Sequence, residues 1–399
     1  MKISNLAFLS DGWWIEEDTA WFLYSDAVAL FKYNFKNGNC EYVSSFQTDR
    51  CCTSRQYVKC IKNEDEIILL PDFGDSILFY SIKNNSWMKV GINASNNVRL
   101  ACWKYIKKGD FLYILSEGLK KIIELDILQK KVANYYDLLS GSDDFIGSSA
   151  MVSDTFYIIS SVYSQIYTFN CLSKETKVYR LPEGIDDNLR TISCHNGNAW
   201  MTGRKKKVYR WNMESGELDS YEKFPSDFGI YDFNNKYNSI LECGIERCEV
   251  PLFIESVLIG TDIWFIPFQT NKILYFNIET NELKEFKLTE EEENAYSVKN
   301  RVLNHKYLLL YVKENRYIGL YSLKNEHMIE IDAETITYRV LPFIMGEACM
   351  EAFSNKLFLE NRKADTFIYS SYLKGSRYSK GEDMGYVGSQ IYQMISSET

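Results

Sequence analysis

The sequence predicts an all-β fold: a single closed β-propeller with eight blades of four antiparallel strands. Three observations support this prediction. A strand–turn–strand unit recurs eight times, its period is near 45 residues, and aromatic residues make up 15% of the 399 residues, with only 6 prolines. Aromatic and β-branched residues favour strands. Repeats of about 45 residues with four short strands are typical of propeller blades.

Each unit is marked by a large apolar residue followed by Asn, Ser or Asp at the end of a strand. The eight copies are Tyr33-Asn34, Tyr80-Ser81, Leu125-Asp126, Phe169-Asn170, Trp211-Asn212, Phe276-Asn277, Tyr321-Ser322 and Tyr369-Ser370. Consecutive copies lie 42 to 48 residues apart, except for one spacing of 65. Turn residues such as Asn37-Gly38 follow the pair and suit tight hairpins. Seven blades with an irregular end are the alternative count.

The units set the expected boundaries of the propeller at residues 1–375. The long spacing indicates an insertion of about 20 residues, which falls within 226–250. The last unit offers strands at 356–360 and 366–372, and ring closure requires one more strand. Residues 3–9 could supply that strand, and so could the C-terminal tail, 376–399, packing on or closing the ring. A ring arrangement buries both faces of every blade.

Composition argues against several classes of partner. The formal net charge is −9, and the one dense basic run, 204–207, lies between strand-like segments. Duplex binding needs a concentrated basic surface, so we expect no nucleic-acid partner. We also expect no membrane partner, because no apolar run approaches the roughly 18 residues of a span. The acidic run 290–293 is interpreted as a solvated loop.

The cysteines and the N-terminus indicate a cytoplasmic protein. The N-terminal apolar stretch is too short for a secretory signal. The 10 cysteines include no CxxC pair, so no metal site is expected from them. We expect the cysteines to be reduced thiols. Four of them on predicted strands should be small core residues. These are Cys60, Cys102, Cys171 and Cys194.

One unit resembles the repeat of streptogramin-lyase-like propellers. It runs Gly260-Thr261-Asp262-Ile263-Trp264-Phe265, then Asn271-Lys272-Ile273, then Glu285-Phe286-Lys287-Leu288. Other units resemble a looser bacterial pattern shared with kelch-like and NHL-like repeats, although the double glycine of kelch repeats is absent. The resemblance covers most of the chain and implies the propeller fold. In lyases of that type it would also imply histidines, carboxylates and a divalent metal.

The histidines do not match that catalytic pattern. Of the 3 histidines, His327 lies in a charged, turn-like stretch, whereas His195 and His305 lie near the first strand of a unit and could face the channel. The sequence does not allow them to be matched residue by residue to the family's catalytic positions, so we assign no catalytic residue, metal ligand or cofactor. Because the resemblance is to lyase-type propellers, a lyase or hydrolase with its site at the channel mouth is kept as the alternative function.

Arginines provide the candidate site. Arg55, Arg99, Arg190 and Arg301 each precede an apolar first strand. In a propeller these positions converge at the mouth of the central channel, where guanidinium forks could hold an anion. Each could instead pair with a neighbouring carboxylate and tie the blades together. We therefore predict a non-catalytic binding or scaffold propeller that engages a protein, peptide or acidic ligand on one face near the channel.

Overall fold

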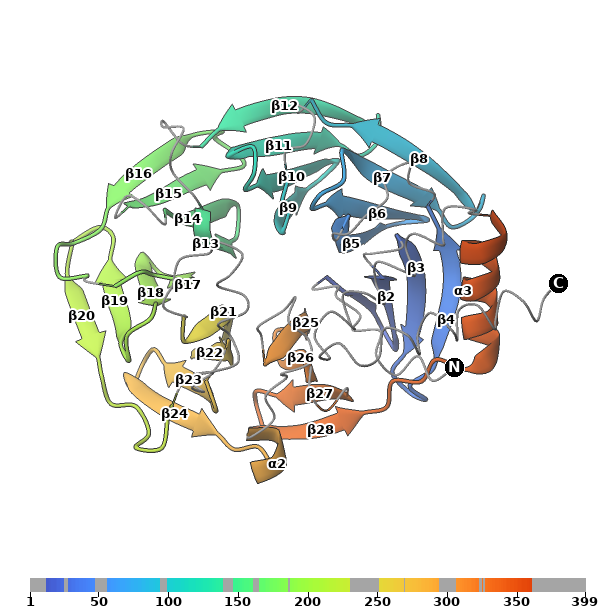
Figure 1. The fold of residues 1–399 in the computed structure, drawn as a ribbon. Coiled ribbons are helices and arrows are strands. Elements are labelled where there is room, and N and C mark those ends of the chain that lie inside the picture. Colours follow the sequence, from blue (N-terminus) through green and yellow to red (C-terminus); the bar gives the residue numbers. More distant parts are fainter. Residues whose placement is uncertain are drawn as a thin grey trace, which may run out of the picture.

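The chain forms a ring of four-stranded sheets (Figure 1). The computed structural model describes residues 12–24, 28–46, 56–93, 99–138, 146–160, 165–185, 187–229, 251–268, 270–293, 306–322, 325 and 327–360. Seven sheets are present in this part of the chain, and each is an antiparallel meander whose strands pair in chain order. The protein is thus an all-β propeller with seven blades, and the prediction of eight blades is wrong while its alternative is confirmed.

The first four blades are built as follows. Blade 1 contains β1 (Trp14–Glu16), β2 (Thr19–Tyr24), β3 (Ala29–Asn34) and β4 (Cys40–Ser45). Blade 2 contains β5 (Tyr57–Asn63), β6 (Glu66–Pro71), β7 (Ser76–Ser81) and β8 (Ser86–Gly91). Blade 3 contains β9 (Lys104–Lys108), β10 (Phe111–Ser116), β11 (Lys121–Asp126) and β12 (Lys131–Asp137). Blade 4 contains β13 (Ile146–Val152), β14 (Thr155–Ser160), β15 (Gln165–Asn170) and β16 (Thr176–Arg180).

The last three blades are followed by a helix. Blade 5 contains β17 (Thr191–His195), β18 (Asn198–Thr202), β19 (Val208–Asn212) and β20 (Leu218–Tyr221). Blade 6 contains β21 (Phe253–Ile259), β22 (Asp262–Pro267), β23 (Ile273–Asn277) and β24 (Glu282–Phe286). Blade 7 contains β25 (Tyr307–Lys313), β26 (Tyr317–Ser322), β27 (His327–Asp332) and β28 (Thr337–Leu341). A short helix, α2 (Glu290–Glu293), joins blades 6 and 7, and α3 (Glu347–Glu360) follows blade 7.

The first strand of each blade lies nearest the channel and the fourth lies on the circumference (Figure 1). We call the face where the chain enters each first strand the entry face, and the opposite face the turn face. The first-to-second and third-to-fourth hairpins lie on the turn face. The basic run at 204–207 is a hairpin turn between β18 and β19, as the sequence predicts.

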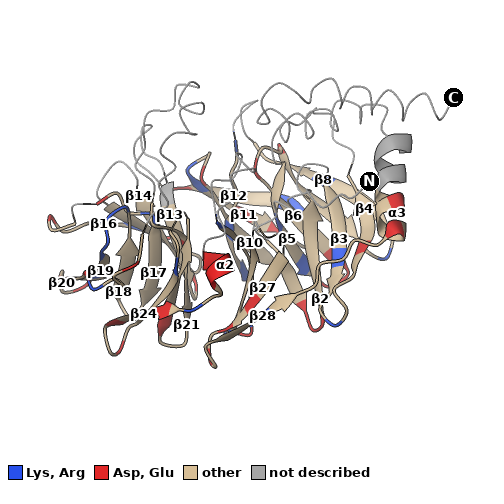
Figure 2. Cartoon of the chain, turned by 60° about the horizontal axis from the view of Figure 1, so that its bottom comes forward, with Lys and Arg blue, Asp and Glu red and all other residues tan. Residues whose placement is uncertain are grey.

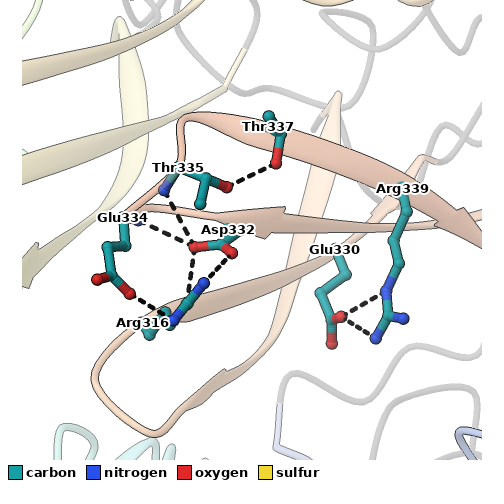
Figure 3. A network of polar contacts seen from close by, with 7 residues as sticks. All are labelled: Arg316, Glu330, Asp332, Glu334, Thr335, Thr337 and Arg339. Carbon is teal, nitrogen blue, oxygen red and sulfur yellow. Dashed lines mark hydrogen bonds and ion pairs between the residues drawn. The ribbon is translucent and has the colours of Figure 1, made fainter.

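The recurring apolar–Asn/Ser/Asp pair ends the third strand of each blade. Its polar side chain accepts backbone N–H groups two or three residues later, as Asn212 Oδ1 does from Glu214 at 3.0 Å and from Ser215 at 2.8 Å. Such a cap closes the outer hairpin turn. In blade 7 this position is held by Asp332, which binds the N–H groups of Glu334 and Thr335 (Figure 3).

Two features of the last predicted units differ from the structure. Tyr321-Ser322 ends β26, a second strand, because that strand also finishes with an apolar residue and a serine. Residues 356–360, predicted as a strand, form the end of helix α3. The remaining predicted strand of the eighth unit, 366–372, lies outside the described residues, as do residues 3–9 and the tail 376–399. The insertion at 226–250 is described only as far as residue 229.

The core lies between neighbouring blades. Seven clusters of buried apolar side chains occur in the described chain, one at each blade boundary. Blades 1 and 7 share the cluster that contains Phe22 and Leu308, so the ring is closed by side-chain packing. Burial of this kind is the main stabilising contribution to a propeller.

Backbone contacts reinforce the closure between complete blades. Trp13 N–H donates to the Leu310 carbonyl at 3.1 Å, and Ile344 exchanges hydrogen bonds with the 38–40 turn on the edge of blade 1. Helix α3 then packs Phe353 against Phe31, with ring centroids 5.4 Å apart. In the described residues the ring therefore closes without a strand exchanged between its ends.

Buried carboxylates also join strands within a blade and, at Glu124, join neighbouring blades. Glu124, on β11, accepts hydrogen bonds from Tyr113 (2.7 Å), Tyr136 (2.7 Å) and Lys174 of blade 4 (2.7 Å). Burial raises the pKa of the Glu124 carboxyl, but these hydrogen bonds outweigh it and lower the pKa to about 2. Glu330 holds the corresponding position in blade 7 and accepts two hydrogen bonds from Arg339 (Figure 3).

The acidic run at 290–293 is not the solvated loop that the sequence predicts. It forms α2, and Glu292 is only 3% exposed. Its carboxylate lies 3.2 Å from His327 Nε2 at the start of β27 and also accepts from Asn325. Burial raises the pKa of Glu292, but hydrogen bonds from His327 and its neighbours lower it to about 2. This carboxylate therefore helps to join blades 6 and 7.

Candidate functional site

Six charged residues on the entry face form what we call the channel-mouth cluster. They are Asp72, Arg99, Lys104, Glu117, Arg190 and Glu255. All lie in loops that lead into or connect the inner strands, or on the first strands themselves. The cluster contains the two predicted arginines that the structure describes. Arg55 and Arg301 lie outside the described residues.

Arg99 is held by a carboxylate and two aromatic rings. Its Nε lies 2.6 Å from Oδ1 of Asp72, a side chain that is 1% exposed, and a second nitrogen lies 3.3 Å from Oδ2. The guanidinium also lies 5.1 Å from the centre of the Phe73 ring and 5.7 Å from that of Trp103. Even so, 47% of the Arg99 side chain is exposed. One bidentate partner and two ring faces hold the group in place while leaving it open to solvent.

The backbone around Arg99 is fixed as tightly as its side chain. Leu100 N–H donates to the Asp72 carbonyl at 2.7 Å, and Ser116 Oγ donates to the Leu100 carbonyl at 2.6 Å. Gly118 N–H donates to the same carbonyl at 3.2 Å. A side chain at Gly118 would collide with the Arg99 carbonyl, so only glycine allows this turn to approach. Blades 2 and 3 thus form a rigid support for the cluster.

Lys104 and Glu255 form an ion pair across the channel. Lys104 begins β9 of blade 3, and Glu255 lies on β21 of blade 6, so two blades separate them on one side of the ring. Their side chains are 23% and 25% exposed. A ligand at the entry face would meet this pair at the mouth of the channel.

Glu117 is a member of the cluster whose pKa departs from its ordinary value. Burial raises the pKa of its carboxyl from 4.5 to about 7, although Arg190, Arg99 and Lys104 favour its charged form. The described residues donate no hydrogen bond to this carboxylate. A carboxyl whose pKa is raised toward neutral pH by burial is typical of functional sites.

Arg190 contributes a second exposed guanidinium. Its backbone N–H is fixed to the Thr202 carbonyl at 2.7 Å, and its side chain is exposed. No ion pair joins this guanidinium to another residue in the described part of the chain. Glu117 and Arg190 are close enough to interact electrostatically.

The two histidines that the structure describes lie away from the channel-mouth cluster. His195 ends β17 on the turn face, where it lines a shallow hollow of about 390 Å³ between blades 5 and 6 together with Trp200, Arg210 and Glu279. His327 pairs with Glu292 as described above, and His305 lies outside the described residues. No group of three or more His, Cys, Asp or Glu side chains in the described residues is placed to hold a metal ion.

The four cysteines predicted as small core residues lie in the core. Cys60, Cys102, Cys171 and Cys194 are buried and free, and burial raises the pKa of each thiol. No described helix has the length and apolar character needed to cross a membrane.

No protein-family model matches the chain, and no curated protein is significantly similar to it. Among solved structures, the extracellular domain of BT4673 from B. thetaiotaomicron is 14% identical, with a TM-score of 0.53 over 84% of this chain and 42% of that chain. The chain is a β-propeller. The computationally designed protein Ika8 is 9% identical, with a TM-score of 0.51 over 83% of this chain and 86% of that one. Such likenesses concern the fold alone.

The sequence prediction included Arg99 and Arg190 of this cluster but not its other members. Asp72 and Glu117 follow second strands, where an acidic residue is ordinarily explained by the turn itself. Lys104 and Glu255 lie 151 positions apart in the chain. Only the ring geometry brings them together, so no local signal could have identified them.

Proposed function

We propose that this propeller is a non-catalytic binding protein that holds an acidic ligand, such as a carboxylate-rich peptide or protein segment, at the channel-mouth cluster. One observation supports this most directly: the exposed Arg190 guanidinium lacks an ion-pair partner among the described residues, and both it and the fixed, half-exposed Arg99 act electrostatically on Glu117. Arg55 and Arg301 are proposed to add to the same site. A cytoplasmic location is part of the proposal and is consistent with the free thiols.

Charge within the cluster favours an anion when Glu117 is protonated. Within the six residues of the cluster, Arg99, Lys104 and Arg190 are then offset by Asp72 and Glu255, which leaves a net charge of +1. Ionisation of Glu117 above pH 7 brings the cluster to neutrality. An acidic ligand should therefore bind more tightly below pH 7 than above it.

A labelled hexaglutamate peptide provides the test. Fluorescence anisotropy should detect its binding to the wild-type protein, and the double variant Arg99→Ala/Arg190→Ala should bind at least about tenfold more weakly, because each charged hydrogen bond contributes about 1.5–3 kcal/mol. Arg180→Ala, on the outermost strand of blade 4, is the matched control and should bind as the wild type does. No binding by the wild type, or equal binding by the double variant, would contradict the proposal.

The pKa of Glu117 favours a second candidate, a lyase or hydrolase with Glu117 as its acid–base group. General acid–base catalysis works best with a pKa near the operating pH. Turnover by such an enzyme would follow a pKa near 7 and would be lost in Glu117→Gln. Peptide binding without turnover would favour the first candidate.

A further inference from the structure

The outer hairpins on the turn face place one equivalent residue at the tip of every blade. This residue follows the capping Asn, Ser or Asp by two positions. We call the seven residues the rim tips. In blade order they are Lys36, Lys83, Leu128, Leu172, Glu214, Glu279 and Glu334.

The same cap positions each rim tip. The capping oxygen of Asn170, for example, accepts the N–H of Leu172 at 2.9 Å, and that of Asn277 accepts the N–H of Glu279 at 3.1 Å. Asp126 caps the Leu128 turn through the N–H of the following residue, Gln129, at 2.8 Å. All seven rim tips are exposed. They therefore form a ring of side chains with a shared geometry at the edge of the turn face.

The chemistry of the rim tips changes in order around the ring. Blades 1 and 2 carry lysine, blades 3 and 4 carry leucine, and blades 5 to 7 carry glutamate. Leu128 and Leu172 are 69% and 67% exposed, more than any other large apolar side chain in the described residues. Two such leucines on adjacent blades are unfavourable in water and are typical of a contact surface.

This order is self-complementary about the boundary between blades 3 and 4. A two-fold axis lying in the turn face and passing through that boundary exchanges blade 3 with blade 4 of a second copy, and blade 2 with blade 5. It would place Leu128 against Leu172 of the second copy and Lys83 against Glu214. An isologous contact requires this kind of self-complementary surface. We propose that a second copy of this chain docks here, with the two turn faces together.

Other charges confine the contact to the outer tips of blades 2 to 5. Lys36 already pairs with Asp18 within the chain. Glu334 likewise pairs with Arg316 (Figure 3). Lys83 and Glu214 make no ion pair with the described residues. The turn face forms the lower edge of Figure 2, where several hairpin turns are coloured red for Asp or Glu. The whole turn faces would therefore repel each other if they met closely near the channel.

Docking in this way would leave both entry faces free. The proposal is thus independent of the channel-mouth cluster, and its failure would not affect the acidic-ligand proposal. A contact of a few tips per copy buries less surface than a standard interface, so we expect a reversible dimer that forms as the protein concentration rises.

Sedimentation equilibrium of the full chain over a wide range of concentrations tests the proposal. The wild type should show a monomer–dimer equilibrium, and Leu128→Asp should be monomeric. Lys83→Glu should raise the dissociation constant about tenfold, because it turns two symmetric attractions into repulsions. The double variant Lys83→Glu/Glu214→Lys should restore the wild-type value.

Lys177→Glu is the matched control, because it makes the same charge reversal on the exposed outermost strand of blade 4. It should leave the dissociation constant unchanged. Circular dichroism should show that every variant keeps its strand content, since all the altered side chains are exposed. A wild type that stays monomeric at the highest concentration, or a dimer that both Leu128→Asp and Lys83→Glu leave intact, would overturn the proposal. A double variant that dimerises no more tightly than Lys83→Glu would also overturn the proposal.

Discussion

Replacing Gly118 with alanine should destabilise the protein by about 2–3 kcal/mol and weaken binding at the channel mouth, because overpacking a rigid site has costs of this size. A Cβ at this position would lie 1.5 Å from the Arg99 carbonyl oxygen and 2.7 Å from its carbon. The clash is with backbone, which cannot turn aside as a side chain can. The chain at Arg99 must therefore move, together with its hydrogen bonds to Asp72 and Ser116.

Urea unfolding followed by tryptophan fluorescence would measure the change in the free energy of unfolding. Gly91→Ala is the matched control, because a Cβ there would meet nothing within 4 Å. The control should change stability by less than about 0.5 kcal/mol, as most surface substitutions do. The folded Gly118→Ala variant should also bind hexaglutamate more weakly than the control does. If the two alanine variants were equally stable, Gly118 would not support Arg99 as proposed.

The sequence predicts the propeller fold because every blade repeats the same local chemistry. A capping side chain such as Asn34 or Asn277 ends each third strand and closes a turn within three residues. Because such a signal spans only a few neighbouring residues, it can be recognised in the sequence without knowing how the blades are arranged in the ring. The blade count was wrong because the eighth unit included residues 356–360, which form the end of helix α3, and because the seventh marker was placed at Ser322, which ends a second strand. Second and third strands have similar apolar patterns, so the repeat marker was assigned one strand too early.

The candidate site could be predicted only in part for a related reason. The position of an arginine before a first strand is a local feature, and it located Arg99 and Arg190. The partners of these residues depend on which blades face each other. Asp72 is buried because the Arg99 segment folds over it, and Glu255 reaches Lys104 only across the channel. The helical state of 356–360 also depends on packing of α3 against blade 1, since its sequence includes strand-forming Leu and Phe.

Glu117 and Glu124 lie on the same blade but should respond to pH in opposite ways. The pKa of Glu117 is raised in the folded state from 4.5 to about 7, whereas that of Glu124 is lowered from 4.5 to about 2. Between pH 4.5 and 7 the unfolded chain ionises at position 117 while the folded protein keeps its proton. Stability from Glu117 is therefore lost as the pH rises through 7. Stability from Glu124 is present above pH 4.5 and is lost as the pH falls through 2.

Substitution by glutamine should reveal this difference, because glutamine resembles a protonated glutamate. At pH 8, Glu117→Gln should be more stable than the wild type by about 2–3 kcal/mol, whereas at pH 4.5 the two proteins should be nearly equal. Glu124→Gln should instead be less stable than the wild type at pH 8, because Lys174 and Tyr113 lose a charged acceptor. Urea unfolding of the three proteins at both pH values would measure these differences. A Glu117→Gln variant that is less stable than the wild type at pH 8 would show that the Glu117 carboxylate is stabilised by the neighbouring arginines, and that the channel-mouth cluster does not change charge near neutral pH.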